Sequence, residues 1–200
     1  MARKKRPELH QERREQIVQA SAQLIQEKGF HGTTLQDVAD QLDFTKAALY
    51  YYVADKQELL FRIHEQALGM LLEATEAIVQ SDQPATMKIC FFIDTQVRLV
   101  TNHLDLFTVY IHEKSRLLAE HAEAVTAKER QVVHALQTII REGIAAGVFE
   151  PLDPTVAAFA VLGANSWVYR WYRPQGRLSV EEISQVLQRM VLGGLEKRRE

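Results

Sequence analysis

The stretch TKAALYYYVADK carries side chains suited to contacting nucleic acid rather than to making or breaking bonds. The ammonium of Lys46 can reach a guanine edge or a phosphate, and Ala47 can touch a thymine methyl. The hydroxyls of Tyr50 and Tyr51 can donate to phosphate oxygens while their rings pack against sugars. Lys56 lies where the next helix should begin, so its cation and the free N–H groups there can hold one phosphate together. The alternative for Lys56 is an ordinary lysine at a helix start, in solvent.

The three adjacent tyrosines have a second interpretation, as part of the core of a small helical bundle. Neighbouring helical residues point about 100° apart, so three in a row cannot share one face. Tyr52 shares a turn with Leu49 and Val53 and is expected to lean on them. Tyr50 and Tyr51 lie off that apolar stripe, which favours an outward position for both.

Two short helices joined by a tight turn are needed to position these side chains. Thr34 and Asp37 form a capping pattern that opens a helix through Leu42, and Thr45 can cap a second helix to about Tyr52. A helix-turn-helix of this kind places the N-terminal residues of its second helix near base edges in the major groove. The apolar contacts expected to fix the crossing are Ala39, Leu42, Phe44, Leu49 and Val53.

Helical spacing of apolar residues continues along nearly the whole chain, without a convincing strand or repeat. A first helix should end at Gly29, and further helices follow the two short ones. They are expected from residue 55 onward, over 84–102, 104–112, a long segment to about 146, 154–173 and 179–196. The sequence therefore predicts an all-α protein of about nine helices, with a small head (residues 1–55) and a larger helical body (residues 56–200).

The composition is that of an ordinary globular protein, with 46% hydrophobic residues and a net charge of -2. Cys90 is the single cysteine of the sequence, so no internal disulfide can form and a reducing compartment is expected. No apolar stretch follows the N-terminus as in a secretory signal, and none approaches the roughly 20 residues of a membrane span. A cytoplasmic protein with no membrane partner is expected.

Positive charge is concentrated in the first residues of the chain. The basic residues there are Arg3, Lys4, Lys5, Arg6, Arg13 and Arg14, against Glu8 and Glu12. A flexible basic arm can lie along a nucleic-acid backbone or enter a minor groove. A solvated tail is the alternative that charge alone leaves open.

The segment GFHGTTLQDVADQLDFTKAALYYYVADKQELL resembles the DNA-binding domain of TetR-family transcriptional regulators. The resemblance implies a dimeric repressor that a ligand releases from a double-stranded DNA operator. The DNA-contacting residues it implies are Thr34, Gln36, Thr45, Lys46, Ala47, Tyr50, Tyr51 and Lys56. Asp43 stands where the family usually has a glycine, so a positive φ is expected at Asp43. Ala47 and Ala48 replace a common Gly-Thr pair, so the operator sequence does not follow.

For the body, the resemblance implies effector binding and a homodimer formed through the last two helices, 154–173 and 179–196. The stretch WVYRWYRPQG is rich in residues typical of interface hot spots, so it favours an interface or pocket edge over plain core. The tail is also similar to the branch of the family that responds to acyl-CoA. Binding such a ligand requires an apolar cavity for the acyl chain and cations for the phosphates. The residues expected to bind such an effector are Phe91, Phe92, Arg98, Tyr110, Arg116, Trp167, Arg170 and Trp171. Each apolar member can equally be ordinary core.

No pattern in the sequence indicates an enzyme. There is no phosphate-binding glycine loop, nucleophile elbow or pair of carboxylates with a histidine at a recognisable spacing. Cys90 lies on an apolar stripe, and the seven histidines match no metal-site spacing, so neither a metal nor a cofactor is expected. The remaining alternative is a protein of the same fold that carries a lipid or acyl-CoA and has lost DNA binding.

Overall fold

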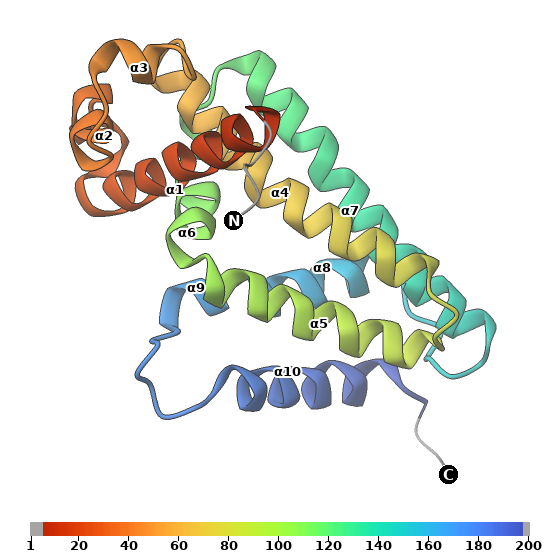
Figure 1. The fold of residues 1–200 in the computed structure, drawn as a ribbon. Helices are drawn as coiled ribbons and strands as arrows, with labels where there is room; N and C mark the ends of the chain where they lie inside the picture. Colours follow the sequence, from red (N-terminus) through yellow and green to blue (C-terminus); the bar gives the residue numbers. More distant parts are fainter. Residues whose placement is uncertain (1–5, 198–200) are drawn as a thin grey trace. The chain divides into compact units, whose positions relative to one another are not determined.

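The computed structural model describes residues 6–197, and this part of the chain is built from helices (Figure 1). They are α1 (Arg6–Gly32), α2 (Leu35–Gln41), α3 (Lys46–Tyr50), α4 (Lys56–Gln80), α5 (Ala85–Asn102), α6 (Leu104–His112), α7 (Ala119–Ala145), α8 (Pro154–Ser166), α9 (Val168–Trp171) and α10 (Val180–Leu195). An isolated bridge between Phe149 and Glu196 is the only β-type pairing in these residues. The predicted all-α fold is confirmed. No helix in the described range is long and apolar enough to cross a membrane.

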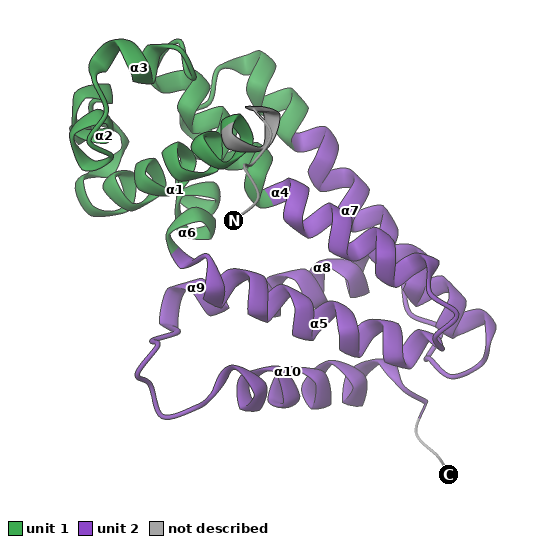
Figure 2. Ribbon diagram, viewed as in Figure 1, with its two compact units in different colours: residues 1–67, 105–125 green, residues 68–104, 126–200 purple. Residues whose placement is uncertain are grey.

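The chain divides into two compact units, shown in Figure 2. Unit 1 comprises residues 1–67 and 105–125, and unit 2 comprises residues 68–104 and 126–200. Unit 1 thus extends beyond the head expected at residues 1–55, because it takes in the first turns of α4 together with α6. Helices α4 and α7 each contribute to both units.

Helix α1 corrects the expectation of a flexible basic arm. It begins at Arg6, so Arg6, Arg13 and Arg14 belong to a helix, whereas Arg3, Lys4 and Lys5 lie outside the described residues. Arg13 donates to Gln16 over 3.1 Å, a contact between neighbouring turns of the helix. Arginine, glutamine and glutamate are strong helix formers, and that propensity outweighs the charge pattern that suggested an arm.

The expected break at Gly29 is confirmed. Its φ of 75° and ψ of 161° are not helical, although a last helical turn follows to Gly32. The buried Thr33 hydroxyl then shares its one proton between two carbonyl oxygens, those of Leu24 (3.1 Å) and Gly29 (3.0 Å). These bonds satisfy carbonyls that the end of a helix leaves without partners.

Helices α2 and α3 form the predicted helix-turn-helix. Thr34 and Asp37 close a capping box on α2, and the Thr45 hydroxyl accepts from the Ala48 backbone N–H over 3.1 Å. Asp43, in the turn, has a φ of 55°, as predicted from its place in the motif. One core holds α1, the two short helices and the start of α4 together: Ile17, Leu24, Val38, Ala39, Leu49, Val53 and Leu59, with Leu35, Leu42, Phe44 and Tyr52 packed against it.

In unit 2, α5 packs against α8, α9 and α10. The Gln188 side chain of α10 donates to the Cys90 carbonyl of α5 over 3.2 Å. Nearer the start of α5, the buried Lys88 ammonium bonds Glu142 of α7 and the Val79 carbonyl of α4, each over 2.9 Å. A buried charge with a carboxylate and a helix-end carbonyl as partners is well compensated.

The single helix expected over residues 154–173 is two helices. Helix α8 ends at Ser166 and α9 begins at Val168, so Trp167 lies at the junction. The Arg170 backbone N–H bonds the Trp167 carbonyl, three residues back, over 3.1 Å. This tighter bond is that of a 3₁₀ turn, and it interrupts the regular α-helical bonding at the junction.

Candidate DNA-binding site and effector pockets

Helix α3 buries Leu49 in the core of unit 1 and turns its other side chains outward. Lys46 and Ala47 are exposed, and the exposed fractions of Tyr50 and Tyr51 are 47% and 73%. The Lys46 ammonium lies 5.9 Å from the centroid of the Tyr50 ring. A cation, two phenols and a methyl group therefore share one exposed surface, which suits the phosphates, sugars and base edges of DNA.

The three predicted contacts at the helix starts are also exposed, and each has a local structural role. Thr34 caps α2, Thr45 caps α3, and the Gln36 side chain donates to Asp40 over 2.7 Å. The Thr34 hydroxyl, and after it the Lys28 ammonium, hold the pKa of Asp37 well below its usual range. The Asp37 carboxylate that closes the capping box of α2 is therefore ionised across the physiological pH range.

The predicted contact Lys56 has partners inside unit 1. Its ammonium donates to the carbonyl oxygens of Phe30 (2.8 Å) and Thr33 (3.0 Å), and lies 4.5 Å from the centroid of the Phe30 ring. The side chain is half-buried. Two of its three N–H groups thus tie the first residue of α4 to the end of α1, leaving one for another partner.

Tyr52 packs against the unit 1 core, as predicted. The ring of His10, in α1, contacts those of Tyr51 and Tyr52, and His10 was not among the predicted residues. The His10 ring centroid lies 4.9 Å from that of Tyr52 and 5.7 Å from that of Tyr51. His10 thus supports the exposed Tyr51, and no local sequence pattern indicates this contact, because 41 positions separate the two residues.

Unit 2 distributes its predicted effector residues over several environments. Phe92 is buried in the core, and Phe91 beside it is exposed. Arg98 bonds Asp94 over 2.8 Å and Glu181 over 2.9 Å, and the first of these carboxylates raises the pKa of its guanidinium most. Arg98 therefore joins α5 to the start of α10 within unit 2.

The other three predicted residues of unit 2, Trp167, Arg170 and Trp171, are exposed. Trp171 lines a small pocket of about 260 Å³ together with Arg173 and Arg177. This places one aromatic ring and two arginines around one hollow, although the volume is below the range usual for drug-sized ligands.

Tyr110 and Arg116 belong to unit 1, in contrast to the other predicted effector residues. Tyr110 is half-buried, with its ring centroid 5.5 Å from that of the buried His64. Arg116 pairs with Glu113, and its guanidinium lies 2.7 Å from Nε2 of His31. Since a guanidinium can only donate, Nε2 of His31 is the acceptor in this contact.

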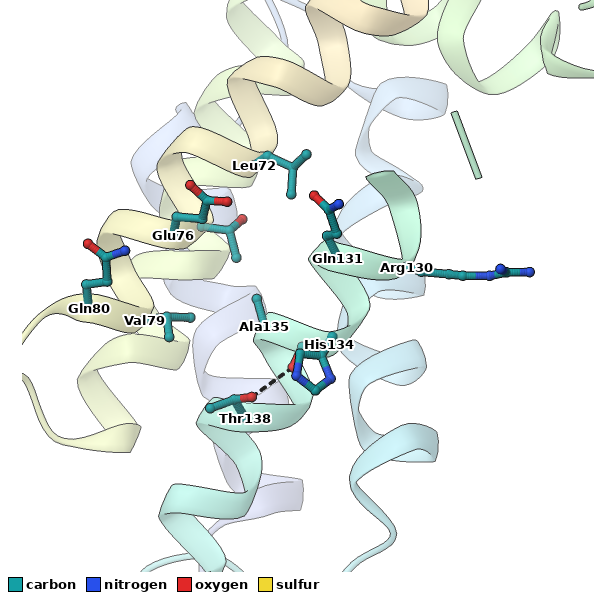
Figure 3. Close-up of a pocket in the computed structure, with 10 residues that line it drawn as sticks. Leu72, Glu76, Val79, Gln80, Arg130, Gln131, His134, Ala135 and Thr138 are labelled. Atoms are coloured by element: carbon teal, nitrogen blue, oxygen red, sulfur yellow. Dashed lines mark hydrogen bonds between the residues drawn. The ribbon is translucent and has the colours of Figure 1, made fainter. Parts of the chain in front are cut away.

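A larger pocket, of about 520 Å³, lies between the unit 2 parts of α4 and α7 (Figure 3). No predicted effector residue lines it. Leu72 and Val79 supply apolar surface, and Glu76 and His134 supply polar groups, whereas Arg130 extends away from α4 in Figure 3. The helical periodicity of α4 and α7 indicated their inner faces, but it gave no signal that a groove would open between them.

Large apolar side chains of α8 and α10, and of the junction that follows α8, are exposed. Val156 and Met190 expose 69% and 70% of their surfaces, and Phe159 and Trp167 are similarly open. Between the two helices lies a hollow of about 470 Å³ lined almost wholly by aliphatic side chains. An exposed apolar area of this kind in a chain that folds around its own core marks an interaction surface.

A helix-turn-helix head with an exposed lysine and tyrosine surface, followed by a large helical body, defines a DNA-binding regulator of the helix-turn-helix class. Residues 17–63 match the model of bacterial regulatory proteins of the tetR family. Residues 82–195 match the model of the tetracyclin repressor-like C-terminal domain. The chain belongs to the TetR family of transcriptional regulators, which confirms the resemblance found in the sequence.

Individual relatives match over nearly the full chain. The HTH-type transcriptional repressor KstR2 of Mycobacterium tuberculosis is 25% identical over 187 residues, 92% of this chain and 94% of the relative. The crystal structure of the TetR-family regulator PfmR from Thermus thermophilus has a TM-score of 0.83 and 31% identity, covering 90% and 99% of the two chains. The structure of AibR in complex with isovaleryl coenzyme A and operator DNA has a TM-score of 0.82 and 29% identity, covering 91% and 99%.

Proposed function

We propose that this protein is a transcriptional repressor that binds a palindromic operator as a homodimer and is released by a small hydrophobic effector. The observation that carries the proposal is the outward face of α3, where Lys46, Tyr50 and Tyr51 are all exposed. Residues kept exposed beside a well-formed core are available to a partner. Here they combine a cation with two hydroxyls that can donate hydrogen bonds to phosphate oxygens.

Each residue of this surface has a distinct proposed role. Lys46 contacts a phosphate and Ala47 a base edge, while Tyr50 and Tyr51 donate to phosphates. Thr34, Gln36 and Thr45 complete the interface at the starts of α2 and α3. Lys56 acts chiefly by holding the start of α4 in place, because two of its N–H groups are already bonded within unit 1.

The apolar surface of α8 and α10 supports the homodimer. A second copy of the same face would bury it, and burial of apolar area is the main driving force of association. Met190→Lys places a charge at the most exposed point of α10 on this face. We expect the variant to be monomeric by sedimentation velocity and to lose tight binding to a two-half-site duplex. Leu118→Lys, at an exposed leucine of unit 1, is the control and should remain dimeric.

An acyl-CoA is the proposed effector class. The support comes from AibR, whose structure contains isovaleryl coenzyme A. Of the predicted cations, Arg170 is exposed, whereas Arg98 and Arg116 are engaged with carboxylates. Effector release requires that the ligand bind the DNA-free state more tightly than the DNA-bound state. Helix α4 begins at Lys56 and runs through both units, so it is the proposed link.

Fluorescence anisotropy with duplexes from the protein's own promoter region tests the proposal. We expect salt-dependent binding to one palindrome, with half-sites about one helical turn apart. Isovaleryl coenzyme A, and separately a long-chain acyl-CoA, should then weaken that binding. Affinity no greater than for random duplex at low salt would refute the repressor. Acyl-CoA binding without DNA binding would instead favour a carrier protein of the same fold.

A further inference from the structure

Two buried amide side chains in unit 2 lack the hydrogen bonds that buried polar groups normally make. Asn165 of α8 is 0% exposed, and neither its Oδ1 nor its Nδ2 has a partner within the described residues. Gln96 of α5 is 5% exposed, and its Oε1 likewise has no partner there. Such groups are rare in folded proteins, since each loses its hydration without compensation.

The two amides occur at the same end of one packed pair of helices. Helices α5 and α8 are in contact, and Figure 1 shows them running in the same direction. Gln96 and Asn165 both lie toward the C-terminal ends of these helices. Two separate helices of unit 2 therefore each carry, toward the same end of the packed pair, a buried amide whose oxygen has no partner.

Other buried polar side chains of unit 2 are satisfied. The Lys88 ammonium has a carboxylate and a carbonyl as partners, the Thr75 hydroxyl donates to the Leu71 carbonyl over 2.6 Å, and Ser184 accepts from Gln188 over 3.1 Å. Within residues 68–104 and 126–197, the buried side-chain atoms without partners are those of Asn165 and Gln96. In the described part of unit 2, unpartnered buried side-chain atoms thus occur only on α5 and α8.

We propose that Asn165 and Gln96 form the polar part of an internal binding site for a neutral ligand group that both donates and accepts hydrogen bonds. A secondary amide or a hydroxyl meets this requirement, because an Asn side chain offers two donors and one acceptor. A charged group does not, since neither amide supplies a counter-charge. The inference rests on the proposed function in that the occupant is the effector. It specifies the part of the effector that is recognised inside unit 2.

Three matched probes test whether the site recognises an amide, a hydroxyl or neither. The N-acetylcysteamine thioester of isovaleric acid carries a secondary amide and no phosphate. The S-ethyl thioester of 3-hydroxyisovaleric acid carries a hydroxyl, and the S-ethyl thioester of isovaleric acid carries neither. Binding of each to the full-length protein is measured by isothermal titration calorimetry, without DNA.

The test variants are Asn165→Leu and Gln96→Met, which replace each amide by an apolar group of similar size. For the ligand-free protein we expect Asn165→Leu to raise the melting temperature by a few degrees, because it removes unsatisfied polar atoms. The same variant should weaken the amide or hydroxyl probe by about tenfold to a hundredfold and leave the plain thioester unchanged. Gln96→Met should act in the same direction. The control Asn102→Leu, at an exposed position of α5, should change neither property.

The outcomes discriminate between binding and structure. If Asn165→Leu lowers the melting temperature, as Ser184→Ala should, the amide has a structural role and the inference is wrong. It is equally wrong if the wild type binds neither polar probe, or if the variants bind them as the wild type does. If the probes bind through the amides but neither isovaleryl coenzyme A nor the long-chain acyl-CoA releases DNA, the site stands and the proposed effector class fails.

Discussion

Replacing Lys56 by methionine separates two roles that a lysine at this position can have. In the structure the Lys56 ammonium donates to two carbonyl oxygens, those of Phe30 and Thr33, at 2.8 and 3.0 Å. A hydrogen bond from a charged donor contributes about 1.5–3 kcal/mol, and the half-buried site lets water replace part of it. We therefore expect Lys56→Met to lower the free energy of unfolding by about 1–3 kcal/mol. In a chain of this size that corresponds to a melting temperature lower by roughly 2–10 °C.

For DNA binding, we expect Lys56→Met to leave the salt dependence almost unchanged, in contrast to its clear effect on stability. Each phosphate contact contributes about 0.9 to the slope of log binding constant against log salt. Because the Lys56 ammonium is held mainly within unit 1, Lys56→Met should weaken DNA binding with little change in that slope. Lys46→Met is the matched control, since Lys46 is exposed. It should reduce the slope by about 0.9 and leave stability within about 0.5 kcal/mol.

Thermal unfolding by circular dichroism and anisotropy titrations between low and moderate salt give both quantities for both variants. An unchanged melting temperature for Lys56→Met, together with a slope reduced as in Lys46→Met, would refute the internal role. Lys56 would then be a phosphate contact, as the sequence first suggested.

Substitutions at four further positions test the backbone and a helix cap. Asp43 has a φ of 55°, so Asp43→Ala should lower the free energy of unfolding by about 1 kcal/mol while Asp43→Gly should not lower it, as urea unfolding will show. At Gly143 a Cβ atom would lie 2.1 Å from the Phe149 ring, so Gly143→Ala should lower the free energy of unfolding by about 1–3 kcal/mol. Gly69→Ala, with nothing within 4 Å, should not lower it. The lowered pKa of Asp37 makes a contribution to stability that is complete above the ordinary value of 3.8 and declines as the pH falls below it. Unfolding midpoints of wild type and Asp37→Asn should therefore differ most above about pH 5 and converge in acid.

The features of the head that the sequence predicted depend on residues close together in the chain. The capping box of α2 joins positions three residues apart, and the positive φ of Asp43 was expected because the family that the segment resembles usually has a glycine there. Local propensity decides such features, because no distant segment is needed to form them. The outward position of Tyr50 and Tyr51 likewise follows from the apolar stripe of a single helix.

The features that the sequence did not predict are contacts between distant segments. Lys56 bonds carbonyls 23 and 26 residues away, and Arg98 pairs with Glu181 across 83 positions. Residue type showed that these cations need partners, but not which partners the fold would supply. The effector residues were harder still, since an aromatic or aliphatic side chain on an inner helix face has the same spacing in a solid core as in a cavity wall.

The unsatisfied amides connect the stability of unit 2 with its proposed regulation. Each buried polar group without a partner raises the free energy of the folded chain by about 1–3 kcal/mol, and an apolar side chain of similar size would remove that penalty. A ligand that supplies the missing bonds lowers the free energy of whichever conformation holds Asn165 and Gln96 in this arrangement. If only the DNA-free conformation does so, each such bond shifts the equilibrium by about 1–3 kcal/mol, or roughly 5-fold to 150-fold. This range equals the coupling typical of allosteric proteins, so the polar site can account for effector release without any contact between effector and DNA.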